Sequence, residues 1–104
     1  MKHRTVIYTP EAGDDLDWIY DTVARASGAT TANRYDARIR AFCERLNCGS
    51  ERGTLRNDVL PGLRLIGFEH SISVAFVVED TQVLILRVFY GRANWAHHLS
   101  GKDE

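Results

Sequence analysis

The sequence contains few cysteines and no long apolar run, and both absences limit what the chain can be. Cys43 and Cys48 are its only cysteines, and their spacing fits neither a CxxC redox pair nor half of a zinc site. We interpret them as free thiols in a reducing compartment, and we expect no metal and no cofactor. No apolar run approaches the ~20 residues that span a bilayer, and no basic-then-apolar leader precedes the first predicted strand. We therefore expect a cytoplasmic protein that makes no membrane contact.

An excess of positive charge is also missing, because 13 basic and 14 acidic residues give a net charge of −1. A protein that neutralises many phosphates along a duplex is usually strongly basic. The composition therefore argues against extended nucleic-acid binding by this chain alone, and leaves room only for a small local basic site. The charges are segregated, since residues 11–21 are rich in acids and residues 34–45 are rich in arginine. The sequence also has no GxGxxG, P-loop, HExxH, EF-hand or GxSxG motif.

The residues that are present are those of a packed domain, with 44% apolar and 10% aromatic side chains. We predict one domain over residues 1–104, which should bury roughly two-thirds of its unfolded surface without disulfides or metals. Valine, isoleucine and aromatic side chains are concentrated between Leu60 and Trp95. The strands predicted there are residues 63–68, 71–79 and 82–90, joined by hairpin turns at 69–70 and 80–81. Strand 82–90 is almost entirely apolar, so we expect it to be central and buried on both faces.

The N-terminal half is mainly helical by its pattern. A short β-rich segment, residues 4–8, precedes a helix whose N-cap is Thr9 and whose end is marked by Gly28. A second helix begins at Thr30 or Thr31 and stops at Gly49, and the short connection predicts an antiparallel helical hairpin. The expected fold class is α+β in two layers, with the order β-α-α-β-β-β and an antiparallel sheet packed by the hairpin.

Arg87 is the most informative single residue. By strand parity it shares a face with Val83, Ile85 and Phe89, so its guanidinium sits among apolar side chains and should be paired. The partner is either an internal carboxylate, which makes Arg87 structural, or an anion from a ligand or another protein. The three predicted strands 63–68, 71–79 and 82–90 form a meander, and Arg64 lies at the start of the first of them. Arg64 could share a face with Arg87 or be an ordinary edge residue.

The end of the last strand carries further polar and aromatic candidates. Tyr90 is either an edge residue of the core or an acid, base or stacking platform. Beyond it, Trp95 suggests a hydrophobic anchor, whereas His97 and His98 are adjacent and cannot easily share one metal. The acidic residues of the first helix lie off its apolar stripe, so we interpret them as a solvated face rather than as a catalytic pair.

The sequence from Pro61 to Trp95, PGLRLIGFEHSISVAFVVEDTQVLILRVFYGRANW, resembles the corresponding half of ParE toxins in the ParE/RelE superfamily of type II toxin–antitoxin systems. The matching features are PGLR before a strand, a pair of hairpins, and LRVFYGR at the end of the last strand. The opening TPEAGDDLDWIYDTVA is similar to the first strand and helix of that family. The resemblance covers nearly the whole chain, so residues 1–104 are expected to form a single ParE/RelE-like toxin domain.

The resemblance implies a function and partners. ParE toxins poison DNA gyrase and are neutralised by a ParD-like antitoxin, which alone contacts operator DNA. RelE-like relatives instead cleave mRNA on the ribosome with basic residues and a Tyr or His. The lysines that RelE-type nucleases place before the second strand are missing, because this chain has only Lys2 and Lys102. That loss favours ParE-like gyrase inhibition by binding over ribosome-dependent endoribonuclease activity, and a relic that only binds antitoxin is a third alternative.

Each alternative assigns roles to particular residues. For antitoxin binding, the expected residues are Arg34, Arg38, Arg45 and Trp18. For the toxicity surface, the expected residues are Arg87, Tyr90, Arg92 and Trp95. For the metal-independent nuclease alternative, the expected residues are Arg64, Arg87, Tyr90 and His97, with two arginines stabilising the phosphate and Tyr90 or His97 moving protons.

Overall fold

The helical hairpin begins where the sequence predicts. In the computed structural model, which describes residues 3–48 and 51–91, helix α1 is Pro10–Ser27 and its N-cap Thr9 accepts a hydrogen bond from the amide of Ala12 at 3.1 Å. Helix α2, Ala29–Glu44, follows after the single residue Gly28, so it begins earlier than the predicted Thr30 or Thr31. Gly28 makes this reversal with a φ of 92°, a backbone region that glycine adopts without steric cost.

Five strands form one sheet. A 3-10 turn, η1 (Arg45–Asn47), ends the hairpin before the strands that follow it. The strands are β1 (Thr5–Tyr8), β2 (Thr54–Leu55), β3 (Leu63–Phe68), β4 (Ile72–Val78) and β5 (Gln82–Tyr90). Their spatial order is β1-β5-β4-β3-β2, so β5 is an internal strand, as predicted. The α+β class and the predicted element order are confirmed, with β2 as an added short strand.

The sheet is mixed rather than wholly antiparallel, which corrects one detail of the prediction. Strand β1 pairs with β5 in parallel, from Thr5 opposite Gln82 to Tyr8 opposite Ile85. All other pairs are antiparallel. The alternation of side chains in residues 4–8 specifies a strand but not its neighbour, because pairing direction depends on where the helical hairpin returns the chain.

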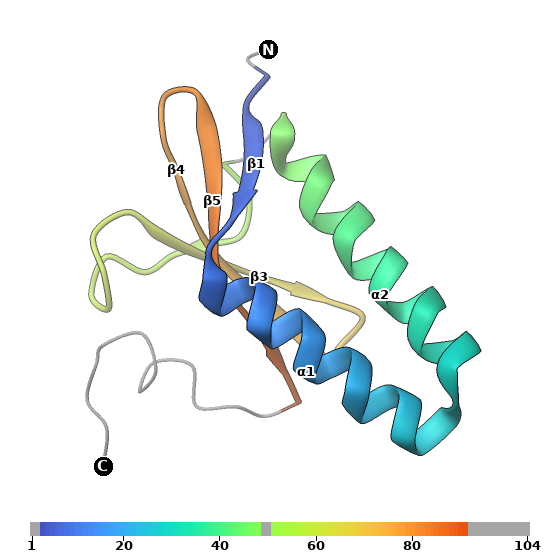
Figure 1. The fold of residues 1–104 in the computed structure, drawn as a ribbon. Helices are drawn as coiled ribbons and strands as arrows, with labels where there is room; N and C mark the ends of the chain where they lie inside the picture. The colour runs from blue at the N-terminus through green and yellow to red at the C-terminus, as the bar shows by residue number, and fades with distance from the viewer. Residues whose placement is uncertain (1–2, 49–50, 92–104) are drawn as a thin grey trace.

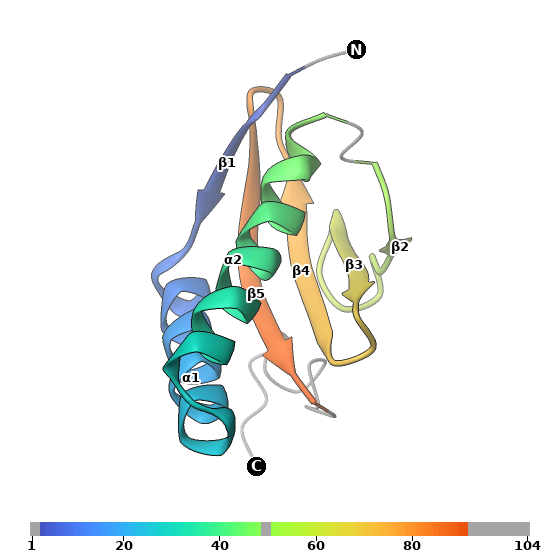
Figure 2. The same cartoon turned by 90° about the vertical axis from the view of Figure 1, so that its right-hand side faces the viewer.

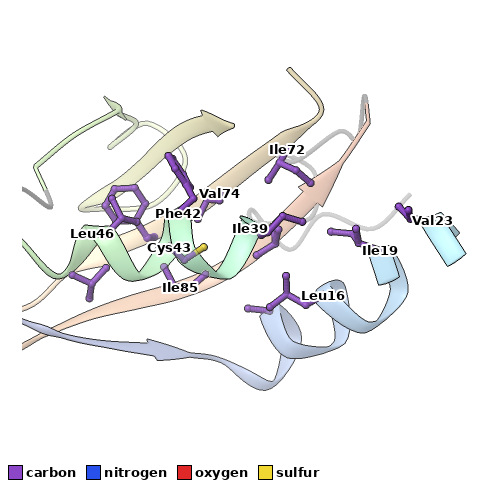
Figure 3. Packing of buried hydrophobic residues seen from close by; sticks show 14 of the residues in the cluster. Leu16, Ile19, Val23, Ile39, Phe42, Cys43, Leu46, Ile72, Val74 and Ile85 are labelled. Atoms are coloured by element: carbon purple, nitrogen blue, oxygen red, sulfur yellow. The ribbon is translucent and has the colours of Figure 1, made fainter. Parts of the chain in front are cut away.

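Both helices lie on one face of the sheet, and the segment between β2 and β3 lies on the other (Figures 1 and 2). The main core is on the helical side and combines residues of α1, α2 and the sheet, among them Leu16, Ile39, Ile72 and Ile85 (Figure 3). A smaller cluster on the far face contains Leu63, Ala75 and Phe89, and is covered in part by Val59 and Leu60. On β4, the side chains of Ile72, Val74, Phe76 and Val78 point to the helices.

An irregularity in β5 changes which side chains share a face. Ala75 pairs with Arg87 and Phe76 pairs with Ile85, so Leu86 is an extra residue in β5. Val83 and Ile85 before the bulge, and Val88 after it, point to the helices, whereas Leu86 and Phe89 belong to the far cluster. The prediction from strand parity, that Arg87 shares a face with Val83 and Ile85, is therefore wrong, because the bulge turns Arg87 to the far face.

Candidate functional site

Arg87 is paired with Asp15 of α1. Its Nε donates to Oδ2 at 2.7 Å and its Nη2 donates to Oδ1 at 2.9 Å, while its guanidinium carbon lies 5.2 Å from the centre of the Phe89 ring. The two side chains are 25% and 15% exposed. Hydrogen bonding to Asp15 raises the pKa of Arg87 above its ordinary value, so the guanidinium is always charged. Of the two roles left open by the sequence, this geometry favours the structural one.

Asp15 also completes the edge of β5. Strand β1 ends opposite Ile85, and beyond that point the amide of Val88 donates to Oδ2 of Asp15 at 2.9 Å. The hydroxyl of Thr9 donates to the carbonyl of Leu86 at 2.9 Å. The start of α1 thus replaces the missing strand, which hides an edge that would otherwise expose unpaired backbone groups.

The interpretation of the first helix as an acidic solvated face is therefore wrong for Asp15. Asp14, Asp17 and Asp21 are exposed as expected, but Asp15 is partly buried. The sequence does contain a signal for this difference. Asp15 is three residues after Ala12 and four before Ile19, so it lies at the border of the apolar stripe rather than opposite to it.

An aromatic cluster lies where the helical hairpin meets the end of β5. Tyr90 makes edge-to-face contacts with Trp18 of α1, at 6.3 Å between ring centres, and with Tyr35 of α2, at 6.1 Å. Trp18 remains 56% exposed, which is unusual for so large an apolar side chain. Trp18 is predicted from the sequence to bind the antitoxin and Tyr90 to belong to the toxicity surface, whereas no role was predicted for Tyr35. The structure brings the first two residues together.

The arginines that were predicted to bind the antitoxin lie along one side of α2 and of the turn η1 that follows it. Arg34, Arg38 and Arg45 are spaced by four and seven residues, which places them along one side. Arg38 lies over the Tyr35 ring at 5.2 Å, and Arg45 lies over the Phe42 ring at 5.9 Å. A cationic stripe backed by aromatic rings can bind carboxylates or phosphates.

Two hollows flank an ion pair on this side of α2. Arg38 donates from Nε and Nη2 to the carboxylate of Glu69, in the loop after β3, at 2.9 and 3.0 Å. The aromatic hollow, about 290 Å³, is bordered by this pair together with Thr31, Tyr35, Ser71 and Tyr90. The Phe68 hollow, about 220 Å³, is bordered by the same pair together with Ala41, Arg45 and Phe68. From the sequence, Glu69 is predicted only as a turn residue.

Arg64 does not join Arg87. Arg64 pairs with Phe76, which points to the helices, whereas Arg87 pairs with Ala75 on the far face. Arg64 instead borders a different hollow of about 360 Å³, which also contains Arg4, Glu79 and Asp80. Of the two alternatives for Arg64, the structure therefore rules out a face shared with Arg87, and within residues 3–48 and 51–91 these two arginines of the nuclease alternative do not form one phosphate cradle.

Several predicted site residues lie outside the described residues. These are Arg92, Trp95, His97 and His98, so their assignments remain predictions. Within the described part of the chain, no group of three or more His, Cys, Asp or Glu side chains could hold a metal ion. No helix in the same part is long and apolar enough to cross a membrane.

Comparison with known proteins identifies the family. Residues 6–95 match the family model described as ParE toxin of type II toxin-antitoxin system, parDE. The chain belongs to the ParE toxin family. No curated protein sequence matches it.

A solved structure agrees with this assignment. The ParE-family chain is similar to a chain from a structure titled "Chromosomal ParDE TA system from P. aeruginosa", with 26% sequence identity and a TM-score of 0.76. The match covers 86% of this chain and 98% of that one. The expected ParE/RelE-like fold is thereby confirmed, and so is the assignment as a type II toxin component.

Proposed function

We propose that this ParE-family chain inhibits DNA gyrase by binding to it, and that a cognate ParD-like antitoxin neutralises it. Family membership supports both parts, and the similar P. aeruginosa structure is titled as a ParDE system. The net charge of −1 fits a protein that reaches operator DNA only through its antitoxin. A toxin of this kind acts in the cytoplasm, where gyrase and the antitoxin are found.

The observation that carries the proposal is the contact between Trp18 and Tyr90, whose ring centres are 6.3 Å apart. Trp18 belongs to the proposed antitoxin surface and Tyr90 to the proposed toxicity surface. A partner that covers Trp18 and the arginines of α2 therefore also covers Tyr90. Neutralisation then follows from occlusion, because the antitoxin covers the residues with which the toxin meets its target.

The separation of Arg64 from Arg87 argues against the nuclease alternative. Cleavage of RNA without a metal requires cationic groups around one phosphate and an acid or base beside it. In the described residues the guanidinium of Arg87 is paired with Asp15, and the side chain of Arg64 points to the opposite face of the sheet. Gyrase inhibition requires no such cradle, only an exposed contact surface.

The deciding experiment measures two activities of the purified chain. We expect loss of gyrase supercoiling with accumulation of linear plasmid, reversal by the cognate antitoxin, and intact mRNA in a translation extract. Cleaved mRNA with unaffected gyrase would instead establish the nuclease. Absence of activity in both assays, together with no toxicity on expression, would indicate an inactive toxin that only binds antitoxin.

Variants can map the toxicity surface in the same assay. Tyr90→Ala should weaken gyrase inhibition at least tenfold, because it removes the ring on which Trp18 and Tyr35 pack. The same measurement on Arg92→Ala and Trp95→Ala tests the two predicted residues outside the described part. Leu55→Ala on β2 is a suitable control, because Leu55 is 46% exposed and belongs to another edge of the sheet. If the control loses as much activity as Tyr90→Ala, the proposed surface is wrong.

A further inference from the structure

The two hollows beside α2 have two bordering residues in common. Both are bordered by Arg38 and Glu69, so the ion pair between these residues forms a bar across what would otherwise be one groove. On one side of the bar the groove is bordered by Tyr35 and Tyr90, and on the other side by Phe68. Opening the pair would join an aromatic hollow to an apolar one with a free guanidinium between them.

The ion pair between Arg38 and Glu69, which forms this bar, should be easy to break. The side chains of Arg38 and Glu69 are 51% and 40% exposed, and exposed ion pairs contribute little to stability. Glu69 and His70 also have φ values of 50° and 65°, and they are the non-glycine residues with positive φ in the described part of the chain. Such a backbone conformation is disfavoured for residues with a Cβ. Glu69 therefore reaches Arg38 from a strained loop.

The charges around the groove indicate the chemistry of its occupant. Glu69 is the only carboxylate among the described residues that border either hollow, while Arg38 and Arg45 are cations. Arg45 has no carboxylate partner in the described residues, and neither does Arg34 on the same face of α2. A groove with one uncompensated arginine, Arg45, a second arginine held by an exposed carboxylate, and aromatic borders fits a segment that carries acidic side chains between apolar ones.

We infer that Glu69 is an internal stand-in for a carboxylate of the antitoxin. When an acidic segment of the antitoxin binds along α2, its carboxylate takes the place of Glu69 on Arg38, and apolar side chains on either side enter the two hollows. This inference rests on the proposed antitoxin partnership and adds its regulation. The toxin keeps its own binding groove partly closed until a carboxylate competes successfully for Arg38.

The inference predicts a gain of affinity on removal of a native contact. A protein whose binding-competent state is only partly populated binds more weakly by that fraction. Glu69→Gln keeps the size of the side chain but removes its charge, so it should bind the cognate antitoxin about three- to tenfold more tightly. Arg38→Ala should bind at least tenfold more weakly. In the Arg38→Ala background, Glu69→Gln should produce little further gain.

A matched control is available on the same helix. Asp36 pairs with Arg40 at 2.9 Å, outside both hollows, so Asp36→Asn breaks an equivalent ion pair and should leave the affinity unchanged. Dissociation constants would be measured by calorimetry with the full-length cognate antitoxin, and circular dichroism would verify that each variant is folded.

The outcomes separate the two proposals. Equal or weaker binding by folded Glu69→Gln, while the wild-type toxin binds normally, would overturn the internal stand-in and leave the antitoxin partnership intact. An equal gain with Asp36→Asn would also overturn it, because the effect would then come from net charge alone. Failure of the wild-type toxin to bind the antitoxin would reject the proposed function itself.

Discussion

At the scale of single residues, the pair of Asp15 and Arg87 decides how the first helix meets the sheet. Asp15 accepts hydrogen bonds from the Arg87 guanidinium and from the amide of Val88. A carboxylate with three donors around it is fully satisfied, which makes burial of both charges tolerable. The pair therefore supports the end of β5, and with it the position of Tyr90.

The contributions of Asp15 and Arg87 to stability should be strongly coupled. We expect Arg87→Ala or Asp15→Ala to lower the free energy of unfolding by about 3 kcal/mol, because a partly buried charge loses its partner. The double variant should lose much less than the sum of the two, since neither charge is then left alone. Urea denaturation followed by circular dichroism measures this difference.

The exposed pair of Arg56 and Asp58 is the control for this cycle. Its geometry is also bidentate, with distances of 2.9 and 2.7 Å, but its side chains are more exposed, at 34% for Arg56 and 64% for Asp58. Arg56→Ala should therefore barely shift the unfolding midpoint. Additive losses at Asp15 and Arg87 would contradict the structural role that we assign to the pair.

At the scale of elements, the two hairpins of the meander differ in their connections. The turn between β4 and β5 is closed by a hydrogen bond from the amide of Glu79 to the carbonyl of Gln82, at 2.8 Å. The loop between β3 and β4 has three residues rather than the predicted two, because Phe68 pairs directly with Ile72. Two of them, Glu69 and His70, have positive φ, so this loop stores strain that the other lacks.

Glycine should therefore have opposite effects in the two hairpins. His70→Gly relieves a positive φ and should raise the free energy of unfolding by about 0.5 kcal/mol, after the added entropy of the unfolded chain is subtracted. Thr81→Gly only adds conformational entropy to the unfolded chain, so it should lower the free energy of unfolding by about 0.5–1 kcal/mol. Thermal and urea unfolding of both variants would measure the two signs, and destabilisation by both would show that the β3–β4 loop is unstrained.

At the scale of the whole molecule, one core joins the helical hairpin to the sheet. Ile39 of α2 is fully buried in the same cluster as Leu16 of α1 and Ile72 of β4 (Figure 3). Neither helix can bury its apolar stripe except against the other and the sheet. The hairpin and the meander should therefore unfold together.

Truncation of this core should destabilise both halves equally. We expect Ile39→Ala to lower the free energy of unfolding by about 2–5 kcal/mol, because a cavity remains where the side chain packed. The midpoints from far-ultraviolet circular dichroism and from tryptophan fluorescence should shift by the same amount. Leu55→Ala, at a side chain that is 46% exposed, should shift neither noticeably. Separate transitions for the two probes would refute a single cooperative core.

The sequence by itself determined the local elements and the family of this protein. Helix caps such as Thr9 and Gly28 depend on neighbouring residues, and so does the alternation of apolar side chains in β4, which is why these features could be predicted. Resemblance in the meander was enough to indicate a ParE toxin. Only local order and composition are needed for such inferences.

The tertiary structure decided which distant residues meet. The parallel pairing of β1 with β5, the bulge at Leu86 and the burial of Asp15 all depend on how the hairpin returns to the sheet. One extra residue in a strand reverses the faces that follow it, so periodicity could not place Arg87. The bridge between Arg38 and Glu69 joins residues 31 positions apart, and no local pattern specifies such a contact.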